Sequence, residues 1–174
     1  YNLVNNVLSL SSGETFRVTG ATANGQLTMG EKKLDSFRVY KEGEEYRVVY
    51  KTGVTEVLRV FGSLALPVRV YSREGRQVSL DYKPYKDSYV LSHIKDGRGD
   101  TLLDLVIGEG TVSVRFYPYS GADGLPLAVY NMTYNAGDLQ TILTLPTEDN
   151  AHWLFKYKDV RGYHCISEVA TPTG

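Results

Sequence analysis

The sequence has few of the residues that form disulfides, metal sites or catalytic centres. Cys165 is the only cysteine, so an internal disulfide and a cysteine-rich zinc site are both excluded. We interpret it as a small buried hydrophobic residue on a strand. The three histidines, His93, His152 and His164, do not form a two-histidine metal motif. We therefore expect neither a metal nor a cofactor.

An excess of one charge and a long apolar run are also missing. The chain carries 19 basic and 20 acidic residues, a formal net charge of −1, which does not favour binding to nucleic acid. No apolar run approaches the roughly 18 residues of a transmembrane helix, so membrane insertion is not expected. The chain starts at Tyr1 without a charged and apolar leader, which we interpret as a processed protein or an excised domain.

Recognisable catalytic motifs are absent as well. The sequence has no Gly-x-Ser-x-Gly elbow and no Walker loop, so we predict a protein that is not an enzyme. The alternative is a carbohydrate-active hydrolase whose carboxylate pair comes from distant strands. Asp81, Asp87, Asp100 and Asp104 are its candidates, because such a pair is defined by separation in space and not by sequence spacing.

What the sequence does contain is a period-two alternation of apolar and polar residues, interrupted by glycine-containing turns. This pattern predicts half-buried strands at short intervals. We expect an all-β fold of two consecutive antiparallel β-sandwich-like modules, with one larger sandwich or barrel as the alternative. Residues 1–10 fit a helix or a strand equally well. The clearest strands are "TFRVTG", "SFRVYK", "EYRVVYK", "EVLRVFG", "PVRVYS", "QVSLDYK", "TVSVRFYPY" and "TILTLP".

The segment "GSLALP" is the expected domain boundary. We predict a small N-terminal β domain over residues 1–62 and a larger C-terminal β-sandwich domain over residues 63–174. Pro67 should open a strand, where its missing amide hydrogen costs least.

Three segments share a strand–turn–strand pattern and have similar residues in it. They are interpreted as tyrosine-rich hairpins that converge in sequence, because repeat arrays keep a fixed period and these do not. The segments are residues 37–51, 68–83 and 154–168.

Tyrosine is abundant, with 14 of 174 residues, and it gathers around two prolines. Tyrosine offers rigid contact area with a polar tip, which suits the recognition of sugars and protein surfaces. It is also a favoured strand residue, so a purely structural role is the alternative. We interpret Trp153, the single tryptophan, as a core residue. The candidate ligand-binding residues are Tyr82, Tyr85, Tyr89, Tyr117 and Tyr119.

The tripeptide Arg98-Gly99-Asp100 matches the integrin adhesion motif. It lies between two predicted strands, "SYVLSHIK" and "TLLDLVI", where the glycines supply the positive φ of a tight turn. We interpret it as a hairpin turn, and integrin-type adhesion is the alternative function.

These observations together predict a non-catalytic binding or structural β module of a larger surface assembly, of the bacterial envelope, adhesin or phage tail type. The expected partners are a protein or glycan surface, with a homo-oligomer or larger assembly included. The expected location is extracellular, in the cell envelope or on a virion surface.

Overall fold

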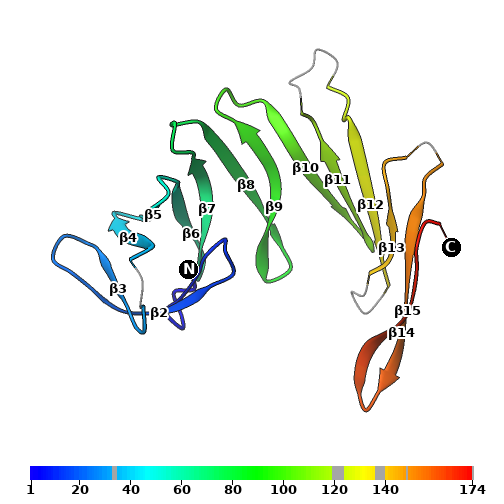
Figure 1. Cartoon of the computed structure of the whole chain (residues 1–174), viewed down its shortest axis with the longest axis horizontal. Coiled ribbons are helices and arrows are strands. Elements are labelled where there is room, and N and C mark those ends of the chain that lie inside the picture. Colours follow the sequence, from blue (N-terminus) through cyan, green and yellow to red (C-terminus); the bar gives the residue numbers. More distant parts are fainter. Residues whose placement is uncertain (33–34, 119–123, 136–139, 148, 174) are drawn as a thin grey trace. The chain divides into compact units, whose positions relative to one another are not determined.

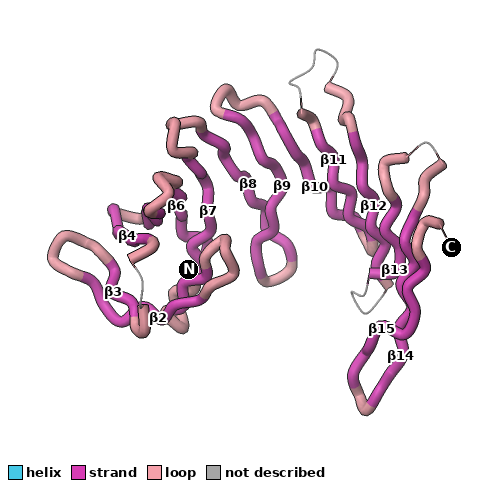
Figure 2. Tube along the Cα trace, in the orientation of Figure 1, coloured by secondary structure: helices cyan, strands magenta, loops and turns pink. Residues whose placement is uncertain are grey.

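The computed structural model describes residues 1–32, 35–118, 124–135, 140–147 and 149–173. All regular structure in these residues is β-strand, as Figures 1 and 2 show, and this confirms the predicted all-β class. The described part of the chain contains no helix, and thus no helix that could cross a membrane.

The strands form two open sheets. A three-stranded sheet has the order β1-β2-β3, and a twelve-stranded antiparallel sheet runs from β15 to β4 in unbroken sequence order. The finer prediction of two sandwich-like modules is not confirmed. The strands are β1 Val7–Ser9, β2 Thr15–Ala21, β3 Leu27–Met29, β4 Phe37–Glu42, β5 Glu45–Tyr50, β6 Thr55–Phe61, β7 Leu64–Tyr71, β8 Gln77–Tyr85, β9 Ser88–Asp96, β10 Thr101–Gly108, β11 Thr111–Phe116, β12 Ala128–Tyr134, β13 Gln140–Thr144, β14 His152–Val160 and β15 Tyr163–Ala170.

Local sequence explains most of these elements. The three similar segments each form a hairpin: β4–β5, β7–β8 and β14–β15. Arg161 and Gly162, with φ of 53° and 83°, form the two-residue turn of the last one, because such turns need positive φ at their central positions. Pro67 differs from the expectation, since β7 begins at Leu64. Pro67 lies beside Leu58 at a register shift, where a residue without an amide hydrogen is tolerated.

The chain divides into two compact units. Unit 1 comprises Tyr1–Val90 and Lys95–Gly99, and unit 2 comprises Leu91–Ile94 and Asp100–Gly174. This division separates regions of dense contact and does not test where a domain folds independently. The predicted boundary after residue 62 therefore stays a prediction.

Unit 1 holds the core of the molecule. The alternation in β4 buries Phe37 and Val39, which are 2% and 1% exposed, while Arg38 between them is exposed. Val48 lies opposite Val39 on β5, and Leu8 from the three-stranded sheet joins the same buried cluster. The two sheets therefore share one apolar core in unit 1.

Residues 1–10, which fit helix or strand from the sequence, form turns followed by the short strand β1. The main chain of Tyr1 exchanges two hydrogen bonds with Ala65 of β7, at 2.7 Å each. The ring of Tyr1 meets that of Tyr46 edge to face, with 5.2 Å between centroids. Apolar contact and ladder pairing thus attach this segment to β5 and β7, which overrides its weak helical pattern.

Unit 2 lacks a comparable core. Among the described residues from Asp100 onward none is buried, although the strands β10 to β15 pair continuously. A sheet with an apolar face must bury that face against another layer to be stable. The uncovered apolar side chains of β10 to β15 are therefore the candidate functional surface.

Candidate functional site

The strands β10 to β15 separate their side chains into two unlike faces. Residues directly opposite each other on antiparallel strands project to the same side, and successive residues alternate. The register places one set, which we call the apolar face, together on one side. The apolar face consists of Leu103, Leu105 and Ile107 of β10, Val112, Val114 and Phe116 of β11, Ala128, Tyr130, Met132 and Tyr134 of β12, Leu143 of β13, Trp153, Phe155 and Tyr157 of β14, and Ile166 and Val169 of β15.

Continuous rows cross this face. Ile107, Val112, Met132, Leu143 and Trp153 lie opposite one another in turn, from β10 to β14. Each is half-buried, because its neighbours in the row shield its flanks while the top of the side chain stays open. Among the residues that the structure describes, no second layer covers this apolar row.

Parallel rows extend the face. Leu105, Val114 and Tyr130 form one of them, and Leu103, Phe116 and Ala128 form another. Phe116 and Tyr130 are 41% and 39% exposed, and on β15 Ile166 and Val169 are 57% and 45% exposed. The most exposed side chains of the face therefore lie on β11, β12 and β15, and the half-buried side chains of β10, β13 and β14 join them into one patch.

The size of the apolar face is unusual for a free surface. Four of its side chains are 39–57% exposed and the others are half-buried, so with side-chain areas on the order of 150–200 Å² the face presents on the order of 800 Å². The largest apolar patch of a typical soluble monomer is about 300–600 Å², and patches above that range mark interaction sites.

The opposite side of the same strands, which we call the polar face, carries the charges. Ser113 donates a 2.6 Å hydrogen bond to Asn131 Oδ1, and Lys156 Nζ lies 2.8 Å from Glu168 Oε1. The polar face also carries exposed apolar side chains, among them Val106, Leu154 and Val160, which are 42%, 36% and 41% exposed. The alternation along the strands therefore places the lysine, arginine and glutamate side chains of β10 to β15 on one side.

Among the described strands β10 to β15, acidic and basic side chains reach the apolar side only at the tip of the β14–β15 hairpin. Asp159 and His164 lie opposite each other there, and Asp159 Oδ1 contacts His164 Nδ1. This pair sits beyond Tyr157 and Ile166, at the margin of the apolar face.

The first tyrosine cluster does not form a free platform. Tyr82 and Tyr89 both pack on Phe61 of β6, with ring centroids 5.5 and 5.2 Å from it. Burial raises the pKa of the Tyr82 hydroxyl, with a further contribution from the negative charge of Glu56. Tyr85 is exposed at 38%, and Lys86 Nζ lies 5.5 Å from its ring centroid. Of the three, Tyr85 is the residue placed to meet a ligand.

The second tyrosine cluster is only partly described. The Tyr117 hydroxyl donates to Asp104 Oδ2 at 3.4 Å, and Arg115 Nη1 lies 3.9 Å from the same oxygen. Asp104 Oδ1 is buried without a hydrogen-bond partner in the described structure. Tyr119 lies outside the described residues. Recognition through either tyrosine cluster stays a prediction.

The adhesion tripeptide lies at the β9–β10 turn. Asp96 accepts a 2.9 Å hydrogen bond from the Arg98 amide, and its other oxygen lies 3.3 Å from the Arg98 guanidinium. Gly99 has a φ of 94°, as a turn glycine should. Asp100, the first residue after the turn, is half-buried. The turn geometry agrees with the hairpin interpretation, and the adhesion alternative stays a prediction.

The carboxylates proposed for a hydrolase are divided between the two units. Asp81 and Asp87 belong to unit 1, whereas Asp100 and Asp104 belong to unit 2. Asp81 Oδ2 lies 2.7 Å from Lys95 Nζ, and this ion pair links β8 and β9. The described residues contain no group of three or more His, Cys, Asp and Glu side chains that could hold a metal ion.

One expectation about a reactive side chain is wrong. Cys165 is exposed, not buried, and lies opposite Lys158 on the polar face. The reason is its position on β15, which ends the sheet order and has no layer over its polar side. His152 is exposed as well, with Nδ1 3.2 Å from the Asn150 carbonyl oxygen.

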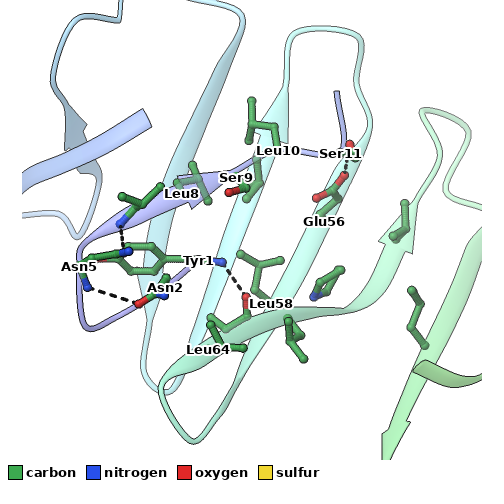
Figure 3. A pocket seen from close by; sticks show the side chains of 17 residues that line it. Tyr1, Asn2, Asn5, Leu8, Ser9, Leu10, Ser11, Glu56, Leu58 and Leu64 are labelled. Carbon is green, nitrogen blue, oxygen red and sulfur yellow. Dashed lines mark hydrogen bonds between the residues drawn. The ribbon is translucent and has the colours of Figure 1, made fainter. Parts of the chain in front are cut away.

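Unit 1 has a cleft of about 620 Å³ beside its N-terminal segment (Figure 3). Leu8, Leu58 and Leu64 line it with apolar surface. Ser11 Oγ donates a 2.9 Å hydrogen bond to Glu56 Oε1 at its polar end. Because Leu8 and Leu58 belong to the core, the cleft is an opening in the packing of unit 1.

No protein-family model matches this chain, and no curated protein is significantly similar to it in sequence. The surface itself must therefore indicate the function.

The apolar face was not found from the sequence. Its signal was present, since "TLLDLVI", "TVSVRF" and "HWLFKY" all alternate. The register that brings Ile107, Val112 and Trp153 into one row is not encoded in any single segment, however, because it depends on how separate strands pair.

Proposed function

We propose that this chain is a non-catalytic, protein-binding β module of a larger assembly, and that the apolar face of β10 to β15 is its docking surface. The observation that supports the proposal is the uncovered apolar face itself. An apolar patch on the order of 800 Å², on a sheet that carries Arg115, Lys156 and Glu168 on its opposite side, is a surface that association would stabilise.

The chemistry of the face favours a protein partner over a sugar. Sugar sites combine a ring platform with several polar groups that fix the hydroxyls. The rows of the apolar face contain aliphatic and aromatic side chains, and two of its tyrosine hydroxyls are already engaged: Tyr134 donates to Met132 Sδ and Tyr157 donates to the Gln140 carbonyl. Apolar side chains of another protein are the complementary surface.

The proposal also includes the setting expected from the sequence, a surface assembly of the envelope, adhesin or virion type. The tyrosine-rich composition and the all-β structure of the described residues support it. Immunogold labelling of intact source cells or particles, with an antibody against this chain, would test the location independently of the docking surface.

A pair of matched substitutions tests the docking surface. Val114→Glu places a charge in the centre of the apolar face, and Val106→Glu makes the same change on the polar face of the neighbouring strand. Exposed apolar surface binds the dye anilinonaphthalene sulfonate, so a free face should bind it strongly. Trp153 reports coverage of the face, through its quenching by acrylamide.

If the apolar face is free, wild-type protein should bind the dye. If the face is covered, Trp153 should be shielded from acrylamide. Val114→Glu should remove that behaviour, and Val106→Glu should retain it. Near-ultraviolet circular dichroism of both variants checks that they remain folded. Equal responses from the two folded variants would contradict a docking role for the apolar face.

A further inference from the structure

A docking surface implies a binding partner, and the residues of the apolar face restrict which partner fits it. We propose that the occupant is the apolar face of a second copy of this chain, so that two sets of β10 to β15 stack into a two-layer β sandwich. This inference rests on the docking function proposed above and names the partner.

The first argument is electrostatic. Two identical surfaces meet without penalty only if they do not bring like charges together. The apolar face contains no charged side chain in the described strands, and the nearest ionisable groups, Asp159 and His164, form a pair with each other at its margin. The polar face, with Lys156, Glu168 and Arg115, points the opposite way and stays hydrated.

The second argument is area. A standard protein–protein interface buries about 800 Å² on each partner. The apolar face presents on the order of 800 Å², estimated from side-chain areas of about 150–200 Å². A second copy thus offers a surface of matching size and matching chemistry, and the interface would be more apolar than that of a transient complex, as in permanent homodimers.

The third argument is architectural. Two sheets pack face to face at about 10 Å with their strands within about 30° of each other, and their side chains interdigitate. The apolar face contains large and small residues side by side, as Phe116 and Ala128 are. A face with large and small side chains side by side can interdigitate with a copy of itself about a two-fold axis.

A lipid surface is the less favoured occupant. Membrane-bound faces are rimmed by lysine and arginine, which reach the anionic headgroups. In this sheet Lys156, Lys158 and Arg115 lie on the polar face, away from the apolar side chains.

Two experiments on the full chain test the second copy. Sedimentation velocity over a range of concentrations should show a dimer for wild type and for Val106→Glu. Val114→Glu should raise the dissociation constant at least about tenfold, the effect of losing an anchor in the centre of an interface.

Cross-linking tests the same surface without adding a charge. In a Cys165→Ser background, Val114→Cys should give a covalent dimer with a short bismaleimide, because stacked sheets bring central residues of the two copies within about 10 Å. Val106→Cys, on the polar face, should give no covalent dimer after the same treatment.

The outcomes separate the two proposals. A dimer that Val114→Glu weakens and Val106→Glu does not, with cross-linking only through Val114→Cys, supports the second copy. A monomer at all concentrations whose apolar face binds the dye, or binds anionic phospholipid vesicles, overturns the second copy and leaves the docking function in place. A monomer that neither binds the dye nor shields Trp153 overturns both.

Discussion

Leu143 of β13 lies directly opposite Trp153 of β14, so the only tryptophan of the chain is paired with an aliphatic side chain in the middle of the apolar face. Cross-strand pairs of this kind stabilise a sheet by about 0.2–1 kcal/mol each. That is far less than the burial of the whole face against a second layer would contribute. Trp153 is therefore a natural reporter of what covers β10 to β15.

The first prediction uses that reporter. If a second copy covers the face, the unfolding midpoint followed by Trp153 emission should rise with protein concentration, because association stabilises the folded state by mass action. Val114→Glu should abolish the dependence. Thermal melts over a hundredfold range of concentration measure it, and a midpoint independent of concentration in wild type would argue against self-association.

The second prediction concerns the core of unit 1. Phe37→Ala should reduce the free energy of unfolding by about 3–5 kcal/mol, because the side chain is fully buried and leaves a cavity. Val4→Ala is the control, since Val4 is 79% exposed and should change stability by less than about 0.5 kcal/mol. Urea denaturation followed by circular dichroism compares the two. Similar losses from both would mean that Phe37 is not packed as described.

The third prediction concerns alkaline pH. Burial, aided by Glu56, raises the pKa of the Tyr82 hydroxyl above its ordinary value of 10.0. A raised pKa in the folded state means that the neutral hydroxyl is favoured by folding. The stability that folding gains from the neutral Tyr82 hydroxyl is complete below pH 10.0 and is lost as the pH rises through the pKa of Tyr82 in the folded state. Tyr82→Phe should therefore lose less stability than wild type between neutral pH and pH 11, as measured by urea midpoints.

The fourth prediction separates the tyrosines of the first cluster. Tyr85→Ala should cost less than about 0.5 kcal/mol of stability, because its ring is exposed. Tyr82→Ala should cost more, because it removes a ring packed on Phe61, a contact worth about 0.5–1.5 kcal/mol beyond its burial. If glycan recognition occurs here, Tyr85→Ala should weaken binding on a glycan array by about 1–2 kcal/mol. Unchanged array binding would exclude Tyr85 as an anchor.

The fifth prediction concerns the adhesion tripeptide. If Arg98-Gly99-Asp100 is only a turn, Asp100→Glu should leave the melting temperature and any attachment to integrin-bearing cells unchanged. Cell-attachment counts on surfaces coated with wild type and variant provide the measurement. Loss of attachment at an unaltered melting temperature would favour the adhesion alternative.

The strands were predictable because each depends on a local pattern. The alternation in "SFRVYK" became β4 with Phe37 and Val39 buried, and glycine turns separated most of the predicted strands as expected. Pro67 was misplaced as the start of a strand, because a bulge allows a proline inside one and a bulge depends on the partner strand.

What a sheet packs against was not predictable. A half-buried strand pattern says that one side is apolar but not which layer covers it. Unit 1 places Leu8 and Leu10 over β4 to β7, whereas β10 to β15 receive no such layer from the described chain. Cys165 was expected to be buried for the same reason, since an apolar-looking strand was assumed to have a covered side. The predicted C-terminal sandwich is not confirmed, and the proposed second copy would supply a second layer to β10 to β15.

The strand order of the long sheet affects how the protein folds and how its sequence can evolve. From β4 to β15 each strand pairs with the next one along the chain, so nearly every ladder closes over a short loop. Low contact order of this kind favours fast folding, and the sheet can grow hairpin by hairpin as the chain leaves the ribosome. A pair of strands inserted or deleted anywhere in that meander would leave the remaining ladders in register. Its length is therefore a variable on which evolution can act in two-strand steps.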